Sequence, residues 1–221
     1  MGERVIVINP NSDRAVTAAM SRNLDSLRFS GGPEICCETL EDAPAGIETA
    51  RHADQVVGPL CDLIAREDER ASAFVIACFG DPGLASARET TQKPVIGICE
   101  GGVTVALNHG EHYGILTNMP ADIGPGLRQI RGLGLDARLA GIEACGIAVT
   151  ELNDTQRAQS ELTAAAQRLK DRGADVVILG CAGMVPYASG VEQAVEVRTI
   201  DPVHAATGIA MTAARSFQAG S

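Results

Sequence analysis

The sequence has no long apolar run, few basic residues and none of the common nucleotide-binding motifs. No apolar stretch approaches the roughly 20 residues that cross a bilayer, so we expect no membrane segment. There are 18 Lys and Arg against 28 Asp and Glu, and the resulting charge of −10 argues against nucleic acid or an anionic membrane as partner. Neither GxGxxG nor GxxxxGK[ST] occurs, which leaves dinucleotide and P-loop binding without support.

Cysteine and histidine are present but lack the spacing of metal sites. The 7 cysteines form no CxxC pair, and the 4 histidines are dispersed, so we expect no metal. The chain runs from Met1 straight into the strand-like segment Val5–Ile8, without the pattern of a signal peptide. We therefore expect a cytoplasmic protein with reduced thiols.

Short apolar runs alternate with stretches of helical period along the chain. Strands are predicted over 4–8, 34–40, 73–77, 95–99, 113–117, 136–140, 176–180 and 196–200. Helices are predicted over 12–27, 46–70, 84–91, 101–108, 121–131, 155–171, 182–189 and 202–216. Because parallel neighbours need crossover connections, this alternation predicts an α/β protein with parallel sheets flanked by helices.

The pattern restarts near residue 110, which predicts two pseudo-symmetric halves with a four-stranded sheet each. Val75-Ile76-Ala77-Cys78 resembles Ile178-Leu179-Gly180-Cys181, as an internal repeat would. We place the first α/β domain at 1–100, joined by the C-terminal helix 205–221, and the second at 101–204. The active site is expected in the cleft between them.

Two cysteines occupy equivalent places in this repeat. Cys78 and Cys181 each follow an apolar strand and precede a glycine-containing turn, and open α/β sheets bind ligands beyond the carboxyl ends of their strands. One thiolate can remove a proton from carbon while an opposite thiol protonates the far face, which inverts the stereocentre. The structural alternative is that both are small core residues; their equivalence favours catalysis.

The segments after both cysteines are expected to assist this chemistry. Helices that begin there would lower the pKa of each thiol through their N-terminal dipoles. Their backbone N–H groups could also stabilise a developing oxyanion.

Four segments resemble the aspartate/glutamate/hydantoin racemase superfamily, in its hydantoin and allantoin racemase branch. The resemblance implies a site between two α/β domains, catalysis by both cysteines, no cofactor and a homo-oligomeric assembly. The matching segments are, in chain order, 8–12, 78–84, 94–98 and 179–184.

Departures within the superfamily indicate the substrate. Its amino-acid racemases carry Asn-Thr after the first cysteine and Thr after the second, whereas this chain has Phe79-Gly80 and Ala182-Gly183. A pocket lined by backbone fits a neutral or weakly acidic cyclic ureide, a 5-substituted hydantoin or allantoin, better than a free amino acid. The C–H group of the hydantoin ring carbon is also more acidic than the α-C–H of an amino acid, so the enzyme has to stabilise the carbanion less.

The resemblance also assigns substrate-binding residues. Asn11 and Ser12 are expected to hydrogen-bond the ring, although both could instead cap the first helix. Ile47 is expected to line the side-chain pocket, or to be simple core. Thr117 ends the strand that echoes the first and is included as a contact; Asp81 is interpreted as a helix cap. The carbonyls of the ring are assigned to the backbone amides of Phe79, Gly80, Ala182 and Gly183.

Other functions stay open beside a hydantoin racemase. One alternative is a decarboxylase similar to arylmalonate decarboxylase. Decarboxylases of the superfamily keep only the second cysteine, so the presence of Cys78 argues against this alternative. Maleate isomerases keep both cysteines but would need hydroxyl-rich carboxylate pockets, and an amino-acid racemase is a further alternative. A non-enzymatic binding domain would have thiols of ordinary reactivity and would not exchange substrate protons.

Overall fold

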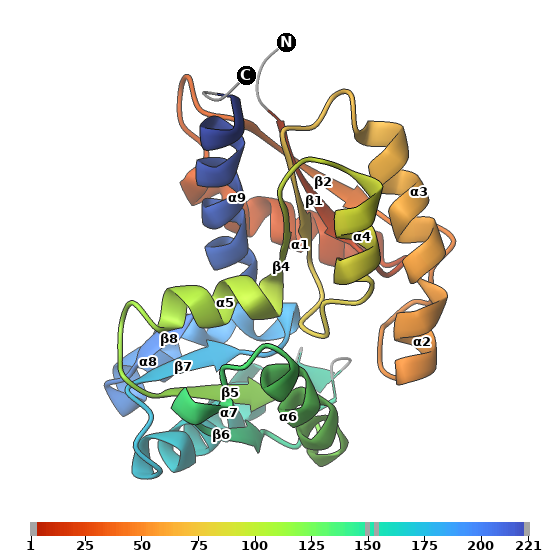
Figure 1. Ribbon diagram of the computed structural model, residues 1–221. Helices are drawn as coiled ribbons and strands as arrows, with labels where there is room; N and C mark the ends of the chain where they lie inside the picture. Colours follow the sequence, from red (N-terminus) through yellow and green to blue (C-terminus); the bar gives the residue numbers. More distant parts are fainter. Residues whose placement is uncertain (1–3, 149–150, 153–154, 219–221) are drawn as a thin grey trace. The chain divides into compact units, whose positions relative to one another are not determined.

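Two four-stranded parallel sheets, each flanked by helices, make up the protein (Figure 1). The structure is a computed structural model that describes residues 4–148, 151–152 and 155–218. The strand order is β2-β1-β3-β4 in the first sheet and β6-β5-β7-β8 in the second, and the registered pairs are parallel. This repeated order confirms the predicted α/β class. The strands are β1 Arg4–Asn9, β2 Glu34–Thr39, β3 Ala73–Ile76, β4 Val95–Gly97, β5 Tyr113–Thr117, β6 Leu139–Ala144, β7 Val176–Leu179 and β8 Arg198–Ile200.

The helices connect successive strands. None of those described is long and apolar enough to cross a membrane. The α-helices are α1 Arg14–Asn23, α2 Ala50–Gln55, α3 Val57–Glu67, α4 Leu84–Thr90, α5 Ile98–Ala106, α6 Ile123–Gly132, α7 Thr155–Asp171, α8 Ala188–Val195 and α9 Pro202–Gln218. Short 3-10 helices are η1 Leu24–Leu27, η2 Pro120–Asp122, η3 Asp136–Arg138 and η5 Ala182–Tyr187.

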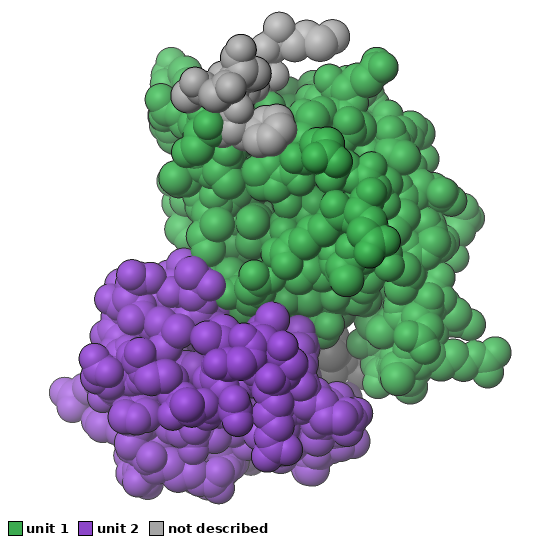
Figure 2. All heavy atoms as spheres, viewed as in Figure 1, with its two compact units in different colours: residues 1–101, 203–221 green, residues 102–202 purple. Residues whose placement is uncertain are grey.

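The chain divides into two compact units, coloured separately in Figure 2. Unit 1 comprises Met1–Gly101 and Val203–Ser221, and unit 2 comprises Gly102–Pro202. The division falls within α5 and near the start of α9. The assignment of these units as separate domains stays a prediction.

Unit 1 packs its first sheet between two groups of helices. Alternating strand residues such as Ile6, Ile8 and Phe74 are buried against α3 and α4. The alternate positions, including Val5 and Val7, are buried too, and Figure 1 shows α1 and α9 on that side. Burial of both faces explains why these strands read as continuous apolar runs.

Unit 2 repeats the arrangement with α7 and α8 on one face of its sheet. Their apolar side chains form one cluster with Leu116 of β5 and with Val177 and Leu179 of β7. On the other face, Gly126 of α6 lies against Ile142 of β6. Each sheet therefore has its own core, and its carboxyl edge is left to turns.

Several sequence expectations on local structure were wrong. The predicted helix 46–70 breaks at Val56, because Pro59 lacks the N–H that would continue the ladder from α2. Residues 182–189 form η5 and only the start of α8. The first helix is capped by Asp13, whose side chain accepts the Ala15 N–H at 2.8 Å, and not by Asn11 or Ser12.

The sixth strand lies further along the chain than the predicted 136–140. Residues Asp136–Arg138 form a 3-10 helix, and β6 follows. The Arg138 guanidinium donates to the carbonyls of Gly110 and Glu111, which holds that segment off the sheet. Glu143 within β6 pairs with Arg168 and Arg172, so this edge strand does not read as apolar.

Candidate active site

The Cys78 turn lies at the carboxyl edge of the first sheet. Ile76 ends β3 in register with Ile8 of β1 and Gly97 of β4. The Ala77 N–H then donates to the Ile8 carbonyl at 2.8 Å, which extends the pairing by one residue. Cys78 follows, half-buried, beside the point where β1 ends. Strand pairing therefore positions this thiol where ligands of α/β sheets bind.

Asn9, at the end of β1, organises the neighbouring turn. It is fully buried, and its Nδ2 donates to Asn11 Oδ1 at 2.8 Å and to Thr17 Oγ1 at 3.1 Å. Asn11 Oδ1 also accepts the Asp13 N–H at 2.9 Å. Because two donors occupy this oxygen, the Asn11 amide can offer a ligand only its nitrogen, a hydrogen-bond donor.

The loop before α2 is fastened to the same turn. The Ser12 N–H donates to the Pro44 carbonyl at 3.1 Å. Ile47 is partly exposed and packs at the margin of the unit 1 core. Unit 1 thus gathers Asn11 and Ser12 into one turn, with the Ile47 loop tied to it. A substrate contact of Ile47 stays a prediction.

The residues after Cys78 form a tight turn with one buried carboxyl group. The Asp81 N–H donates to the Cys78 carbonyl at 2.9 Å, while Phe79 is half-buried and Gly80 exposed. The Asp81 carboxylate accepts the N–H groups of Cys99 at 2.9 Å and Glu100 at 3.0 Å, in the first turn of α5. The prediction that Asp81 is an N-cap does not hold for the helix that follows it, because the N-cap of α4 is Gly83. The Asp81 carboxylate instead bonds first-turn N–H groups of α5.

The Cys181 turn has the same place in unit 2. The Gly180 N–H donates to the Leu116 carbonyl at 2.7 Å, and the Met184 N–H donates to the Cys181 carbonyl at 3.0 Å. A Cβ on Gly180 would lie 2.3 Å from the Leu116 oxygen, so only glycine allows this approach. Ala182 and Gly183 follow at the start of η5 and are partly exposed.

Burial raises the pKa of the Cys181 thiol above its ordinary value, and a hydrogen bond from the Gly183 backbone opposes this only in part. The expected lowering was therefore wrong for Cys181. The helix that begins there is a short 3-10 helix, whose few aligned peptides form only a small dipole. Loss of water around the sulfur outweighs it.

Thr117 ends β5, as predicted, and is nearly buried. Its hydroxyl donates to Asp122 Oδ2 at 3.2 Å, and the Met119 N–H donates to the same oxygen at 2.9 Å. The threonine can therefore only accept a hydrogen bond from a ligand. The Asp122 side chain thus holds the turn after β5 by hydrogen bonds, as the Asn9 side chain holds the turn after β1.

The structure brings the predicted residues together in two groups. Each group lies at the carboxyl edge of its own sheet, and the roles of its members stay predictions. In the described part of the chain, no three His, Cys, Asp or Glu side chains are grouped to hold a metal ion. Unit 1 holds Asn11, Ser12, Ile47, Cys78, Phe79 and Gly80, and unit 2 holds Thr117, Cys181, Ala182 and Gly183.

Sequence reasoning missed Asn9 and Asp122, the side chains that shape the two strand-end turns. Asn9 carried a usable signal: a polar residue directly ends an apolar strand and precedes a proline. Asp122 carried none, because its acceptor role depends on the turn that folds back onto Thr117.

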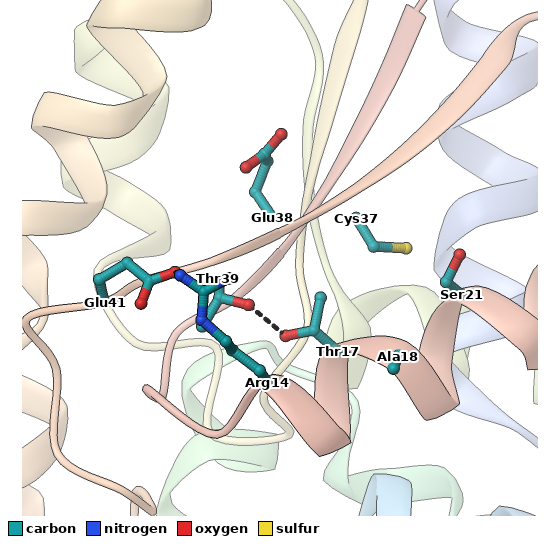
Figure 3. A pocket seen from close by; sticks show the side chains of 8 residues that line it. All are labelled: Arg14, Thr17, Ala18, Ser21, Cys37, Glu38, Thr39 and Glu41. Carbon is teal, nitrogen blue, oxygen red and sulfur yellow. Dashed lines mark hydrogen bonds and ion pairs between the residues drawn. The ribbon is translucent and has the colours of Figure 1, made fainter.

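A shallow hollow of about 300 Å³ lies elsewhere on unit 1, between α1 and the edge strand β2 (Figure 3). Thr17 and Thr39 share a 2.7 Å hydrogen bond there, and Arg14 pairs with Glu41 at 2.6 Å. The hollow contains none of the predicted site residues. It is lined by Arg14, Thr17, Ala18, Ser21, Cys37, Glu38, Thr39 and Glu41.

Two like-ordered parallel sheets, each with a cysteine just beyond its third strand, are typical of a class of α/β racemases. The comparison with protein families agrees: residues 5–210 match the family described as Asp/Glu/Hydantoin racemase. The chain belongs to this family, whose racemases are isomerases.

Several of the similar proteins are hydantoin or allantoin racemases. A hydantoin racemase of Rhizobium meliloti is 33% identical over 207 residues, which cover 92% of this chain and 86% of the relative. The allantoin racemase structure from Klebsiella pneumoniae has a TM-score of 0.88 at 29% identity, covering 96% of this chain and 87% of that one. For allantoin racemase from Pseudomonas fluorescens the TM-score is 0.90 at 25% identity, with coverages of 97% and 92%.

Proposed function

We propose that this protein racemises 5-substituted hydantoins, allantoin among them, by transferring protons through Cys78 and Cys181. One thiolate removes the proton from the ring carbon bearing the substituent, and the other thiol protonates the opposite face. The observation that carries the proposal is the equivalence of the two cysteines, each just beyond the third strand of its sheet. Membership of the racemase family and the hydantoin and allantoin racemases among its relatives support it.

The surroundings of both thiols fit a cyclic ureide. Exposed or half-buried backbone follows each cysteine, at Phe79-Gly80 and at Ala182-Gly183. Backbone N–H groups can hold a ring carbonyl and its enolate-like oxyanion without introducing a charge. The Asn11 amide nitrogen, which faces no acceptor among the described residues, is a further donor for a ring carbonyl. A free amino acid would instead need hydroxyl or charged groups for its carboxylate, which these four positions do not supply.

The raised pKa of Cys181 fits one step of this chemistry. A thiol that holds its proton at neutral pH is suited to donate it to a carbanion. The acidity of the hydantoin ring carbon reduces the basicity that the partner thiolate needs. We propose in addition that the enzyme needs no metal or cofactor, works in the cytoplasm and forms a homo-oligomer.

The proposal is tested with single enantiomers of a 5-substituted hydantoin and of allantoin in D₂O with EDTA. We expect optical rotation to decay to zero while one deuterium enters each inverted molecule, faster than in the enzyme-free control. Cys78→Ser and Cys181→Ser should each lower the rate by roughly 10³-fold, because general acid–base groups contribute on this order. Cys61→Ser, in α3, is the matched control. Full racemisation by either site variant would exclude the two-base mechanism.

A further inference from the structure

Asp81 joins the Cys78 turn to the start of α5. Its backbone is bonded to Cys78 through the 2.9 Å hydrogen bond that closes the turn. Its carboxylate accepts the N–H groups of Cys99 at 2.9 Å and Glu100 at 3.0 Å. One residue therefore holds the thiol-bearing turn with its main chain and a separate helix with its side chain.

Two features show that the surrounding structure is shaped around this carboxylate. Asp81 has φ of 43°, a left-handed conformation that costs energy for a residue other than glycine. Gly97 lies against it so closely that a Cβ there would be 2.3 Å from Asp81 Cγ. Only glycine at 97 leaves room for the carboxyl group, which is itself almost fully buried.

We propose that Asp81 is a positioning residue for Cys78, which it holds in place by anchoring the Cys78 turn to the first-turn N–H groups of α5. The inference rests on the proposed role of Cys78 in the reaction. Asp81 does not touch the reacting carbon in this proposal. It fixes the sulfur so that the carbon and the thiol meet at the short distance that proton transfer needs.

The electrostatics of Asp81 give the anchor a pH dependence. Burial raises the pKa of its carboxyl group to about 7, and the two backbone hydrogen bonds oppose this only in part. Glu100 of α5 raises the pKa further, whereas Arg88 of α4 lowers it. Cys99, buried in the same contact, has its own pKa raised by burial and by Asp81. The charge of the anchor therefore changes near neutral pH.

Unit 2 provides an internal comparison. Met184 is the third residue after Cys181, as Asp81 is after Cys78, and its N–H makes the equivalent turn bond at 3.0 Å. Its thioether is buried in the apolar core. The Cys181 turn thus has no carboxylate at this position. The carboxylate that acts on its thiol is that of Asp122, outside the turn, which adds to the raised pKa of Cys181 after burial.

The test is peptide-resolved alkylation of both cysteines with iodoacetamide, which reports on each thiol without requiring racemase activity. In the Asp81→Asn variant we expect Cys78 to react about fivefold faster at pH 8, since its turn loosens and a negative charge is removed. Cys181 should be unchanged. Asparagine also tolerates a positive φ, so the variant isolates the carboxylate.

Turnover should move in the opposite direction. We expect kcat to fall by about 10- to 100-fold with KM within about threefold, because misplacement of a reacting group affects the chemical step more than binding. Asp175→Asn is the control: its carboxylate also accepts two backbone N–H groups, from Glu111 and His112 at 2.9 Å, at the other end of a sheet.

The wild-type protein offers a second measurement if the variant does not fold. A thiol below its pKa alkylates ten times faster for each pH unit. For Cys78 the alkylation rate should rise less than tenfold per pH unit near pH 7, because the charge that Asp81 gains there disfavours the thiolate. For Cys181 the rate should keep rising tenfold per pH unit. Equal slopes for both cysteines, or a change of less than twofold at Cys78 in Asp81→Asn, would overturn the proposal. Absence of racemisation by the wild-type protein would instead refute only the proposed function.

Discussion

The Cys78 and Cys181 turns have the same backbone hydrogen bonds but differ in one buried side chain. In each, the residue before the cysteine bonds the neighbouring strand, at 2.8 Å in unit 1 and 2.7 Å in unit 2. In each, the third residue after the cysteine closes a turn onto its carbonyl. That residue is a buried aspartate in one turn and a buried methionine in the other. The repeat thus preserves the position of the cysteine at the sheet edge, while the electrostatic surroundings of the two thiols differ.

The largest expected effect divides the two turns by the enantiomer that each serves. Cys78→Ala and Cys181→Ala should both lose racemisation by roughly 10³-fold. Each should still exchange the ring proton of one enantiomer for deuterium, because the remaining thiol can remove and return a proton on its own face. Proton NMR of separate D and L substrates in D₂O measures this exchange.

The two variants should retain exchange with opposite enantiomers. The enzyme-free exchange rate is subtracted, and Cys61→Ala serves as the control variant. Exchange of the same enantiomer by both variants would mean that the two thiols do not act on opposite faces of the ring carbon. The proposal that each thiol serves one enantiomer would then be wrong.

The next effect concerns the buried carboxylate of unit 1. The folded-state pKa of Asp81, about 7, lies above the ordinary 3.8, so between these values the folded protein keeps a proton that the unfolded chain has lost. Its contribution to stability is fully present below pH 4 and is lost as the pH rises through 7. The loss amounts to ~4 kcal/mol at most.

Asp81→Asn should flatten this part of the stability profile. The measurement is urea denaturation at several pH values between 4 and 8, followed by circular dichroism because the chain has 0 Trp. Asp175→Asn is the control variant, because its carboxylate also accepts two backbone N–H groups. If the two variants have the same pH dependence, Asp81 is not the group that titrates.

A smaller effect tests the residue before each cysteine. A Cβ at Gly180 would lie 2.3 Å from the Leu116 carbonyl oxygen, so Gly180→Ala should destabilise the protein by about 3 kcal/mol. Unit 1 already has alanine there, and Ala77→Gly should cost only about 1 kcal/mol. Urea denaturation compares them. Similar costs for both would show that the two strand ends are packed alike.

Local sequence predicted the elements that are buried on both faces and missed those that depend on distant contacts. β1 and β7 read as apolar runs because helices cover both faces of their sheets. The shifted β6 did not, since Glu143 within this edge strand is a largely buried carboxylate paired with two arginines. The positions of the cysteines at strand ends followed from where the apolar runs stop.

The partners of the candidate site were beyond such reading. Asp81 was predicted to be an N-cap, but the helix whose N–H groups it bonds begins 17 residues further on, at Ile98. The pKa of Cys181 depends on how deeply the core of unit 2 surrounds it, which no motif records. The catalytic roles of Cys78 and Cys181 remain predictions, which the racemisation and deuterium-exchange measurements on the cysteine variants test.

The smallest expected effect separates the turns after the first strand of each unit. Asn11 offers a ligand a donor, whereas Thr117, whose hydroxyl donates to Asp122 at 3.2 Å, can offer only an acceptor. Thr117→Val should therefore cost about 1 kcal/mol of stability and raise KM about threefold, with kcat nearly unchanged. Thr117→Ser keeps the hydroxyl and should restore KM. A ureide ring presents both N–H and C=O groups, so one donor and one acceptor would orient it. An unchanged KM in Thr117→Val would show that Thr117 does not bind the substrate and that its hydroxyl serves only the hydrogen bond to Asp122.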